Sequence, residues 1–298
     1  IVFDIGGIDY YPPRAFQDLD DTCINRISAI HDGIDLHILD DASFDTKAGY
    51  VNFVSYIVDI ISGTLRLGTQ QRGALIQAVA YAVEHKSEHP SEMDAIIKGL
   101  KMQDTPVSKS VYNKLWQILK SDILRDDGKD IEKGMINVIS FQDINPSTQK
   151  NLIEIVLASI WRTLRSGGVD MEDITLIIDE FQNLSLKQDS TLFEMLRESR
   201  KYGVNLIFSP QTVAAFKKEV MASITQTAVQ LYFKPTVSDI DKIAAIINPD
   251  DTKKWVNTLR GLMIGESVTL GNISIREKEF KDPLIIQSHY TKDKSNNR

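Results

Sequence analysis

Several residue types that define whole classes of protein are scarce in this chain of 298 residues. The single cysteine, Cys23, excludes an intramolecular disulfide framework and a cysteine-based zinc site, and it suits a reducing cytoplasm. No apolar run approaches the roughly 18–20 residues that span a bilayer. The longest candidate, residues 50–61, is interrupted by Asn52, Ser55 and Asp59. We therefore expect a cytoplasmic protein with no membrane span in this chain.

Positive charge is also in short supply. Lys and Arg number 34 against 41 Asp and Glu, which gives a net charge of −7. This balance argues against a surface that is broadly basic for nucleic-acid binding, but not against a protein that contacts nucleic acid through a few loops. Hydrophobic residues at 42% and charged residues at 25% are ordinary for a globular protein. The length allows one large α/β domain or two small ones.

A phosphate-binding loop of the form Gly-x-x-x-x-Gly-Lys-Ser/Thr is missing from the sequence. Residues 63–69 have the glycine spacing, but they lack the lysine that neutralises the β- and γ-phosphates, and they lie between two helical patterns. We interpret them as a helix–helix connection. The sequence does not begin with Met, and residues 1–4 have the composition expected for the middle of a β-strand. We therefore expect it to be part of a longer polypeptide.

An apolar run that ends in two carboxylates is the most informative stretch. Four of the five residues 174–178 are Ile or Leu, with Thr175 between them, which predicts a strand buried on both faces of a parallel sheet. Asp179 and Glu180 follow at its C-terminal end, where open α/β sheets bind ligands. Nucleotide hydrolases use such a pair to hold Mg²⁺ and to polarise water. A simple acidic turn is the alternative.

A helix and a second strand follow this run. Residues 192–202 have the apolar spacing of an amphipathic helix, and Gly203 is placed to end it. Residues 204–208 form an apolar strand that leads to Gln211. Strand, helix and strand within about 35 residues make one right-handed crossover unit. We therefore expect the two carboxylates and Gln211 at the same edge of one sheet.

A resemblance to a known family rests on four segments: LIIDEFQNL, RESRKYG, VNLIFSPQT and AVQLYFKP. They resemble segments of the HerA/FtsK-type ATPases, above all the conjugative coupling proteins and related DNA-pumping motors. The resemblance extends over residues 135–270 and is weaker near the N-terminus. It implies an α/β fold: a RecA-like, mostly parallel sheet with helices on both faces, plus a small helical insertion.

The same resemblance implies cofactors and partners. The cofactors would be ATP and Mg²⁺, and the substrate would be DNA. The chain would form a homo-oligomer, a hexameric ring, and could meet other subunits of a DNA-transfer or defence complex. Residues 1–4, which end at Asp4 before a glycine turn with Asp9, resemble the strand that follows the phosphate-loop helix in these ATPases. That loop would then lie upstream; an ordinary glycine turn is the alternative.

Individual residues are assigned by their position in this resemblance. Asp179 and Glu180 resemble the Walker B pair, in which Asp179 holds the metal and Glu180 activates water. Gln211 resembles the sensor glutamine that contacts the γ-phosphate. Arg200 resembles an arginine finger that reaches the nucleotide of a neighbouring subunit, and Arg197 is the second choice for that nucleotide contact. A capping role for Gln211 and a solvated helix end for the arginines remain open.

The pattern along the chain also predicts domains. We expect residues 1–83 to form the N-terminal part of the ATPase core and 84–134 a helical insertion. Residues 135–290 would contain the Walker B and sensor strands, and 291–298 would be a polar tail.

Other elements are predicted more locally. Residues 12–30 are polar with a weakly helical period, and residues 36–39 read as a short strand. A helix over 111–124 would turn Trp116 inward. A long helix is expected over 146–165, and a terminal hairpin over 261–270 and 272–275.

A possible zinc motif lies in residues 85–89. His85 and His89 fit the pattern His-x-x-Glu-His, whose spacing places both imidazoles on one helix face. Pro90 follows directly in a charged connector, and no third ligand is apparent. A solvated helix end is therefore the preferred interpretation, and a zinc hydrolase is the alternative.

Together these observations predict the ATPase domain of a ring-forming DNA translocase or pump, an enzyme that acts as part of a longer chain. The competing prediction is a truncated or degenerate ATPase-fold module that does not hydrolyse ATP and serves in assembly or DNA docking. The missing phosphate loop favours this alternative. The presence of Asp179, Glu180, Arg200 and Gln211 opposes it.

Overall fold

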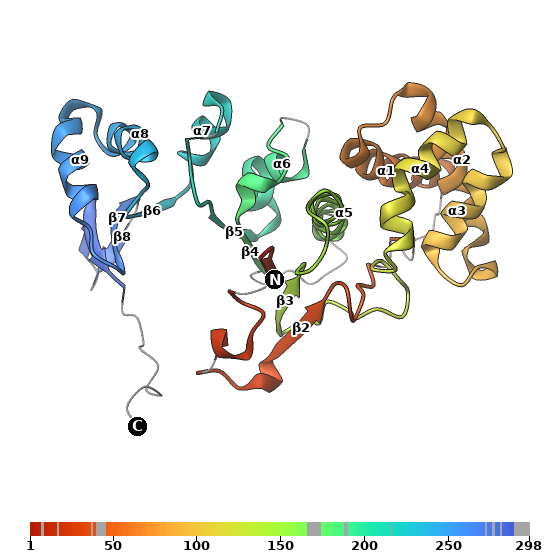
Figure 1. Ribbon diagram of the computed structural model, residues 1–298, viewed down its shortest axis with the longest axis horizontal. Helices are drawn as coiled ribbons and strands as arrows, with labels where there is room; N and C mark the ends of the chain where they lie inside the picture. Colours follow the sequence, from red (N-terminus) through yellow and green to blue (C-terminus); the bar gives the residue numbers. More distant parts are fainter. Residues whose placement is uncertain are drawn as a thin grey trace. The chain divides into compact units, whose positions relative to one another are not determined.

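The chain folds into two compact units, Ile1–Ser209 and Pro210–Arg298, and each is described by itself. Figure 1 traces the chain in this computed structural model, coloured along the sequence. The structure describes residues 1–6, 9–16, 18–36, 38–39, 46–165, 174–187, 190–214, 216–271, 273–275, 278–280 and 282–288.

A five-stranded parallel sheet with the order β2-β3-β1-β4-β5 forms the centre of the first unit. Each neighbouring pair of strands runs in parallel. Helices flank the sheet, so the predicted α/β class with a parallel sheet is confirmed (Figure 1). The strands are β1 (Val2–Asp4), β2 (Ile24–Ser28), β3 (Ile136–Ser140), β4 (Ile174–Asp179) and β5 (Val204–Ser209).

The register of these strands aligns their C-terminal ends. Phe3 pairs with Ile178, so Asp4 and Asp179, the residues that follow them, close β1 and β4 at the same level. Asp179 also lies opposite Ser209 at the end of β5. Because parallel strands all finish at one edge, polar side chains from three neighbouring strands meet there.

The two helices that connect β3 to β4 and β4 to β5 have the predicted positions. α5 (Pro146–Arg165) begins and ends at the expected residues, since proline suits the first turn of a helix. Trp161 lies on its buried face. α6 (Thr191–Glu198) continues into a 3-10 turn, Ser199–Tyr202, and the helical segment ends where Gly203 adopts a φ of 66°. The amphipathic helix and its glycine stop are confirmed.

A helical bundle connects β2 to β3 (orange to yellow in Figure 1). In its interior, the helix that contains Gly99 packs closely against the helix that contains Ala78. A Cβ placed on Gly99 would lie 2.8 Å from the Ala78 Cα, so glycine is needed at this position for the two helices to approach so closely. The predicted start of the helical insertion, at residue 84, falls in the last turn of the second helix. The predicted domain boundaries stay a prediction. The helices are α1 (Lys47–Leu65), α2 (Thr69–His85), α3 (Glu92–Gln103) and α4 (Pro106–Lys120).

The prediction that Trp116 faces the core is wrong. The buried residues of α4 include Val111, Leu115 and Ile118, which are four and three positions apart and share one face. Trp116 lies one residue, about 100°, further around the helix than Leu115, and 51% of it is exposed. The helix also ends at Lys120, before the predicted residue 124.

α1 needs a separate comment because of its length. It has 19 residues and is long and apolar enough to cross a membrane by length and composition alone. A core helix of a globular protein meets the same criteria, and Phe53, Ile57 and Ile61 of α1 are buried. The expected lack of a membrane span stays a prediction.

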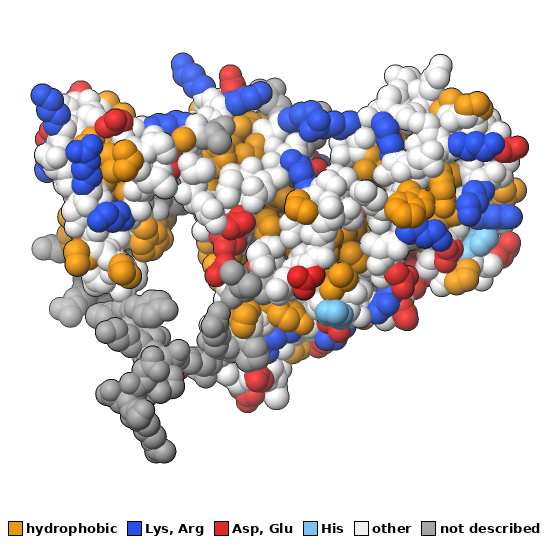
Figure 2. Space-filling view, viewed as in Figure 1, with side chains coloured by type: hydrophobic (Ala, Val, Ile, Leu, Met, Phe, Trp, Pro, Cys, Tyr) orange, Lys and Arg blue, Asp and Glu red, His pale blue; other side chains and the backbone are white. Residues whose placement is uncertain are grey.

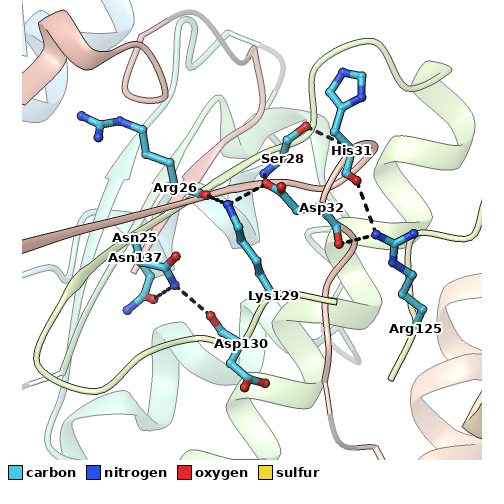
Figure 3. Close-up of polar contacts among 9 residues, drawn as sticks. All are labelled: Asn25, Arg26, Ser28, His31, Asp32, Arg125, Lys129, Asp130 and Asn137. Carbon is cyan, nitrogen blue, oxygen red and sulfur yellow. Dashed lines mark hydrogen bonds and ion pairs between the residues drawn. The ribbon is translucent and has the colours of Figure 1, made fainter. Parts of the chain in front are cut away.

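β2 was expected to lie in a weakly helical stretch, and this expectation is wrong. The polar Asn25 interrupts the apolar pattern of this strand, although its side chain is buried and paired with the buried Asn137. Figure 3 shows this pair and the neighbouring Asp130. The Asn25 Nδ2 donates to the Oδ1 of Asn137 on β3 at 2.9 Å and to the Asp130 carbonyl at 2.8 Å.

The prediction of a strand over residues 36–39 is also wrong for the residues that the structure describes there. The β-bridges in this region are made by Ile34.

The second unit contains a three-stranded antiparallel sheet with the order β10-β7-β6. The predicted hairpin between 261–270 and 272–275 is wrong: β7 pairs with β6 and β10, whereas β8 pairs with β9. The predicted polar tail lies outside the described residues. The strands are β6 (Val229–Phe233), β7 (Glu266–Gly271), β8 (Ile273–Ile275), β9 (Lys278–Phe280) and β10 (Leu284–Gln287); the helices are α7 (Lys218–Ile224), α8 (Val237–Ile247) and α9 (Thr252–Gly261).

Candidate functional site

The turn after β4 presents the two adjacent carboxylates. Glu180 leaves the strand in the left-handed conformation, with a φ of 50°. Its backbone N–H donates to the Ser209 carbonyl at 2.8 Å and to the Asp179 Oδ1 at 2.9 Å. The next residue, Phe181, is fully buried, and its ring packs against Phe208 with 5.1 Å between centroids. The apolar anchor and the backbone bonds therefore fix Glu180 at the edge of the sheet.

Negative charge accumulates around Glu180. Burial raises the pKa of its carboxyl group, and the charges of Asp179, Asp9 and Asp4 raise it further. The pKa of Tyr10 is raised by burial and then by the same three aspartates. Figure 2 shows a group of Asp and Glu side chains over the ends of β4 and β5. Carboxylates gathered in this way repel one another, so a cation placed among them would be attracted strongly.

Asp4 organises the turn that brings Asp9 to this edge. Its side chain is buried at 1% exposure, and its Oδ2 accepts the backbone N–H groups of Tyr10 at 2.9 Å and Tyr11 at 2.7 Å. The sequence shows Asp4 at the end of a short apolar run, but assigns it no role. Its contribution becomes visible only when the register places β1 beside β4.

Asn183 is a further polar residue at this site for which no role was predicted. Its Nδ2 donates to the Glu180 Oε2 at 3.3 Å, from within the 3-10 turn Phe181–Asn183. The spacing of three residues in LIIDEFQNL is the signal that could have found it, because residues three apart lie on one side of a tight turn.

The carboxylates fit a Mg²⁺ ion that arrives with a nucleotide. Among the described residues, no group of three or more His, Cys, Asp and Glu side chains could hold a metal ion by itself. Mg²⁺ does not need such a cage, because it keeps several waters and takes one or two carboxylates together with phosphate oxygens. Asp179, at the end of β4, would hold the ion, which would neutralise phosphate charge when bound.

The predicted arginines lie at the end of α6. Arg197 is in its last turn and Arg200 in the 3-10 turn that follows, and both side chains are exposed. Gln211 is also exposed, two residues after β5. It belongs to the second unit, so its shared edge with Glu180 stays a prediction.

The histidines of the zinc motif both turn to one tyrosine. The His85 Nδ1 lies 3.0 Å from the Tyr81 carbonyl oxygen, and the His89 Nε2 lies 3.1 Å from the Tyr81 hydroxyl. The His85 ring also stacks on the Tyr81 ring, with 4.3 Å between centroids. These contacts explain the two side chains as part of a helix end.

The RecA-like fold of this chain is similar to the folds of two solved proteins. The chain is 14% identical to VirB4 of Thermoanaerobacter pseudethanolicus, with a TM-score of 0.69 over 97% of this chain and 82% of that one. The bacterial conjugative coupling protein TrwBdeltaN70, in complex with sulphate, is 12% identical with a TM-score of 0.62, over 95% and 77% of the chains. The predicted resemblance and the RecA-like sheet are confirmed.

A sequence match agrees with this fold. The DNA double-strand break repair helicase HerA of Saccharolobus solfataricus is 21% identical over 174 residues, which are 54% of this chain. The match spans 33% of HerA, so the chain covers about a third of that protein. No model of a known protein family matches the chain.

Proposed function

We propose that this chain is the ATPase domain of a DNA-transfer motor, which hydrolyses ATP with Mg²⁺ and moves DNA as a ring of identical subunits, six by analogy with the family. The observation that carries the proposal is the Asp179–Glu180 pair at the C-terminal end of β4, beside the carboxylates that β1 and its turn supply. The likeness to VirB4, TrwB and HerA supports this choice among nucleotide hydrolases.

Each site residue has a role in this proposal. Glu180 accepts a proton from the attacking water, and its raised pKa brings it closer to the neutral range in which a general base works well. Asp179 holds Mg²⁺. Gln211 contacts the γ-phosphate, and Arg200, or Arg197 in its place, stabilises charge on the nucleotide of the neighbouring subunit.

The proposal requires a phosphate loop, which this sequence does not contain. Backbone amides and a lysine of such a loop bind the triphosphate, and the carboxylates alone cannot replace them. A loop contributed by residues beyond this sequence would complete the site. Without one, the second candidate applies: a module of the same fold that does not hydrolyse ATP and serves in assembly or DNA docking.

ATP hydrolysis by the full-length protein, with and without DNA, tests the proposal. We expect Glu180→Gln to reduce the rate by about 10²–10⁴-fold, the usual contribution of a general base, and to leave ATP binding intact. Glu88→Gln, an exposed glutamate after α2, is the matched control and should hydrolyse ATP normally. A Glu180→Gln protein with normal activity would refute the catalytic role. A wild-type protein that neither binds nor hydrolyses ATP would support the second candidate.

A further inference from the structure

Cationic side chains from four segments lie around the loop that follows the carboxylate pair. Lys187 belongs to this loop, Lys150 to the first turns of α5, Lys114 to α4, and Arg66 ends α1. We call these four residues the basic patch. Arg66, Lys114 and Lys187 are exposed, and 39% of the Lys150 side chain is exposed.

Glu154 joins the loop to α5. Its carboxylate accepts the backbone N–H of Ser185 at 2.9 Å, two residues before Lys187. The Nζ of Lys150, one helical turn earlier on α5, lies 4.0 Å from the same Glu154 oxygen. This arrangement brings Lys150 and Lys187 to the same side of the molecule.

Two hydrogen bonds join α4 to its neighbours in the patch. The Lys114 Nζ donates to the Arg66 carbonyl at 3.3 Å, which fixes Lys114 beside the end of α1. One turn further along α4, the Gln117 Oε1 accepts from the Thr148 hydroxyl at 3.0 Å. Since Thr148 is in the first turn of α5, this bond joins the α4 surface that carries Lys114 to the start of α5, where Lys150 also lies.

The charges of the patch act on one carboxylate. Burial raises the pKa of Glu154, and the positive charges of Lys150, Arg66 and Lys187 oppose that rise. Three of the four cations of the patch therefore act on one partly buried anion, in a chain whose net charge is −7. Figure 2 shows Lys and Arg side chains gathered on the surface between α6 and α1.

We propose that the basic patch is a docking surface for the phosphate groups of a nucleic-acid backbone, beside the loop that follows Glu180. The cations are exposed and come from four segments, so they fit the repeated charges of a backbone better than the single phosphate of a small molecule. The choice of nucleic acid as the polyanion rests on the proposed function. Docking there would place the backbone against the same loop that continues from the catalytic carboxylate.

The test compares two triple variants of the full-length protein that remove the same amount of charge. The patch variant is Lys114→Gln, Lys150→Gln and Lys187→Gln; the control variant is Lys98→Gln, Lys101→Gln and Lys133→Gln, all exposed and outside the patch. Affinity for a labelled oligonucleotide, single-stranded and duplex, is measured by fluorescence anisotropy across a salt series. Circular dichroism and urea unfolding verify that both variants fold.

The expected result is a weakening of binding that is specific to the patch variant. Its affinity should fall by about tenfold or more, and the slope of log affinity against log salt should decrease by about three, one for each phosphate that the variant no longer neutralises. The control should keep the wild-type slope. Equal weakening in both variants would show that net charge alone is responsible and would overturn the proposal, as would an unchanged patch variant.

The substitution Glu154→Gln should strengthen oligonucleotide binding, whereas the patch variant should weaken it. Glutamine keeps an oxygen that can accept the Ser185 N–H, while the negative charge is removed. Affinity for the oligonucleotide should rise by about threefold, the effect of one unit charge at about 7 Å in water. A fall in affinity with the fold intact would contradict the proposal.

Binding measurements with three other phosphate compounds test whether the patch is specific for nucleic acid. Inorganic phosphate, ATP and phosphatidylglycerol vesicles are offered to the same variants. A patch-dependent affinity for any of these, with oligonucleotide binding unchanged, would overturn the assignment to nucleic acid. ATP hydrolysis without DNA separates the two proposals, because it should be lost in Glu180→Gln and retained in the patch variant.

Discussion

The backbone N–H of Glu180 donates to the Ser209 carbonyl at 2.8 Å, one residue beyond the last residue of β4. The hydrogen-bond ladder between β4 and β5 thus continues past Asp179 and into the turn. Glu180 completes that bond in a left-handed conformation that residues other than glycine adopt at a cost of about 1–2 kcal/mol. Strain of this kind persists where the surrounding structure fixes it, and functional sites are where it gathers.

Replacement of Glu180 by glycine should therefore stabilise the protein. Glu180→Gly removes the left-handed strain, whereas Glu180→Ala keeps the strain and removes the same carboxylate. We expect the free energy of unfolding of Glu180→Gly to exceed that of Glu180→Ala by about 1 kcal/mol, measured by urea denaturation. Both variants should lose ATP hydrolysis. An alanine variant as stable as the glycine variant would show that the turn is not strained.

Asp9 should control the pH at which hydrolysis begins. A general base acts when ionised, so the raised pKa of Glu180 moves the acidic limb of the rate profile to higher pH. Asp9→Asn removes one of the negative charges that raise this pKa, and the limb should shift to lower pH. Asp94→Asn, on α3, is the control and should leave the profile unchanged. A shift to higher pH in Asp9→Asn would contradict the electrostatic argument.

Arg200→Ala should assemble normally and hydrolyse ATP slowly, by a factor on the order of 10³–10⁵ if Arg200 acts as an arginine finger. Arg197→Ala should stay active in that case. A mixture of Arg200→Ala and Glu180→Gln subunits gives the sharper result, because some interfaces then combine an intact Glu180 with an intact Arg200. Activity should reappear on mixing; two inactive proteins that stay inactive would exclude action across a subunit boundary.

Asn137 should be important for stability at the opposite end of the sheet. It is 3% exposed; its Oδ1 accepts from Asn25 and the Glu132 N–H, and its Nδ2 donates to the Glu132 and Met135 carbonyls. Asn137→Ala removes all of these hydrogen bonds from a buried site and should lower the free energy of unfolding by about 3 kcal/mol. The exposed Asn52→Ala should change it by less than about 0.5 kcal/mol. Similar destabilisation of both variants in thermal unfolding would refute the role of the buried amide.

Local patterns were sufficient to predict α5 and β4. Pro146 marks the start of α5, and the run of Ile and Leu before Asp179 predicts a strand. The expected burial on both faces is incomplete, because only Leu176 and Ile178, which share one face, are fully buried, whereas Thr175 and Ile177 are partly buried. β2 was missed because a buried Asn25 looks like a surface residue until Asn137 is placed beside it, 112 positions along the chain. A pattern that repeats every few residues contains no information about such a distant partner.

In the candidate site, too, some residues could be predicted from the local sequence and others could not. Asp179 and Glu180 are adjacent in sequence, so their placement at a strand end followed from the apolar run before them. The contribution of Asp4 needed the register of two strands that are about 170 residues apart in sequence, as shown by Phe3 opposite Ile178. The position of Trp116 was mistaken because three other residues of α4 already fill the inward face. The roles assigned to Arg200 and Gln211 stay predictions.

β2 is an edge strand of the parallel sheet, and its surroundings oppose pairing with strands of other chains. The Lys129 ammonium donates to the Arg26 carbonyl at 2.9 Å and pairs with Asp32 (Figure 3). Ile34 makes β-bridges to Leu124 and Lys129. A foreign strand arriving at this side would meet a charged side chain where it needs an open backbone acceptor. Fibril-like stacking through β2 would therefore have to displace a lysine first.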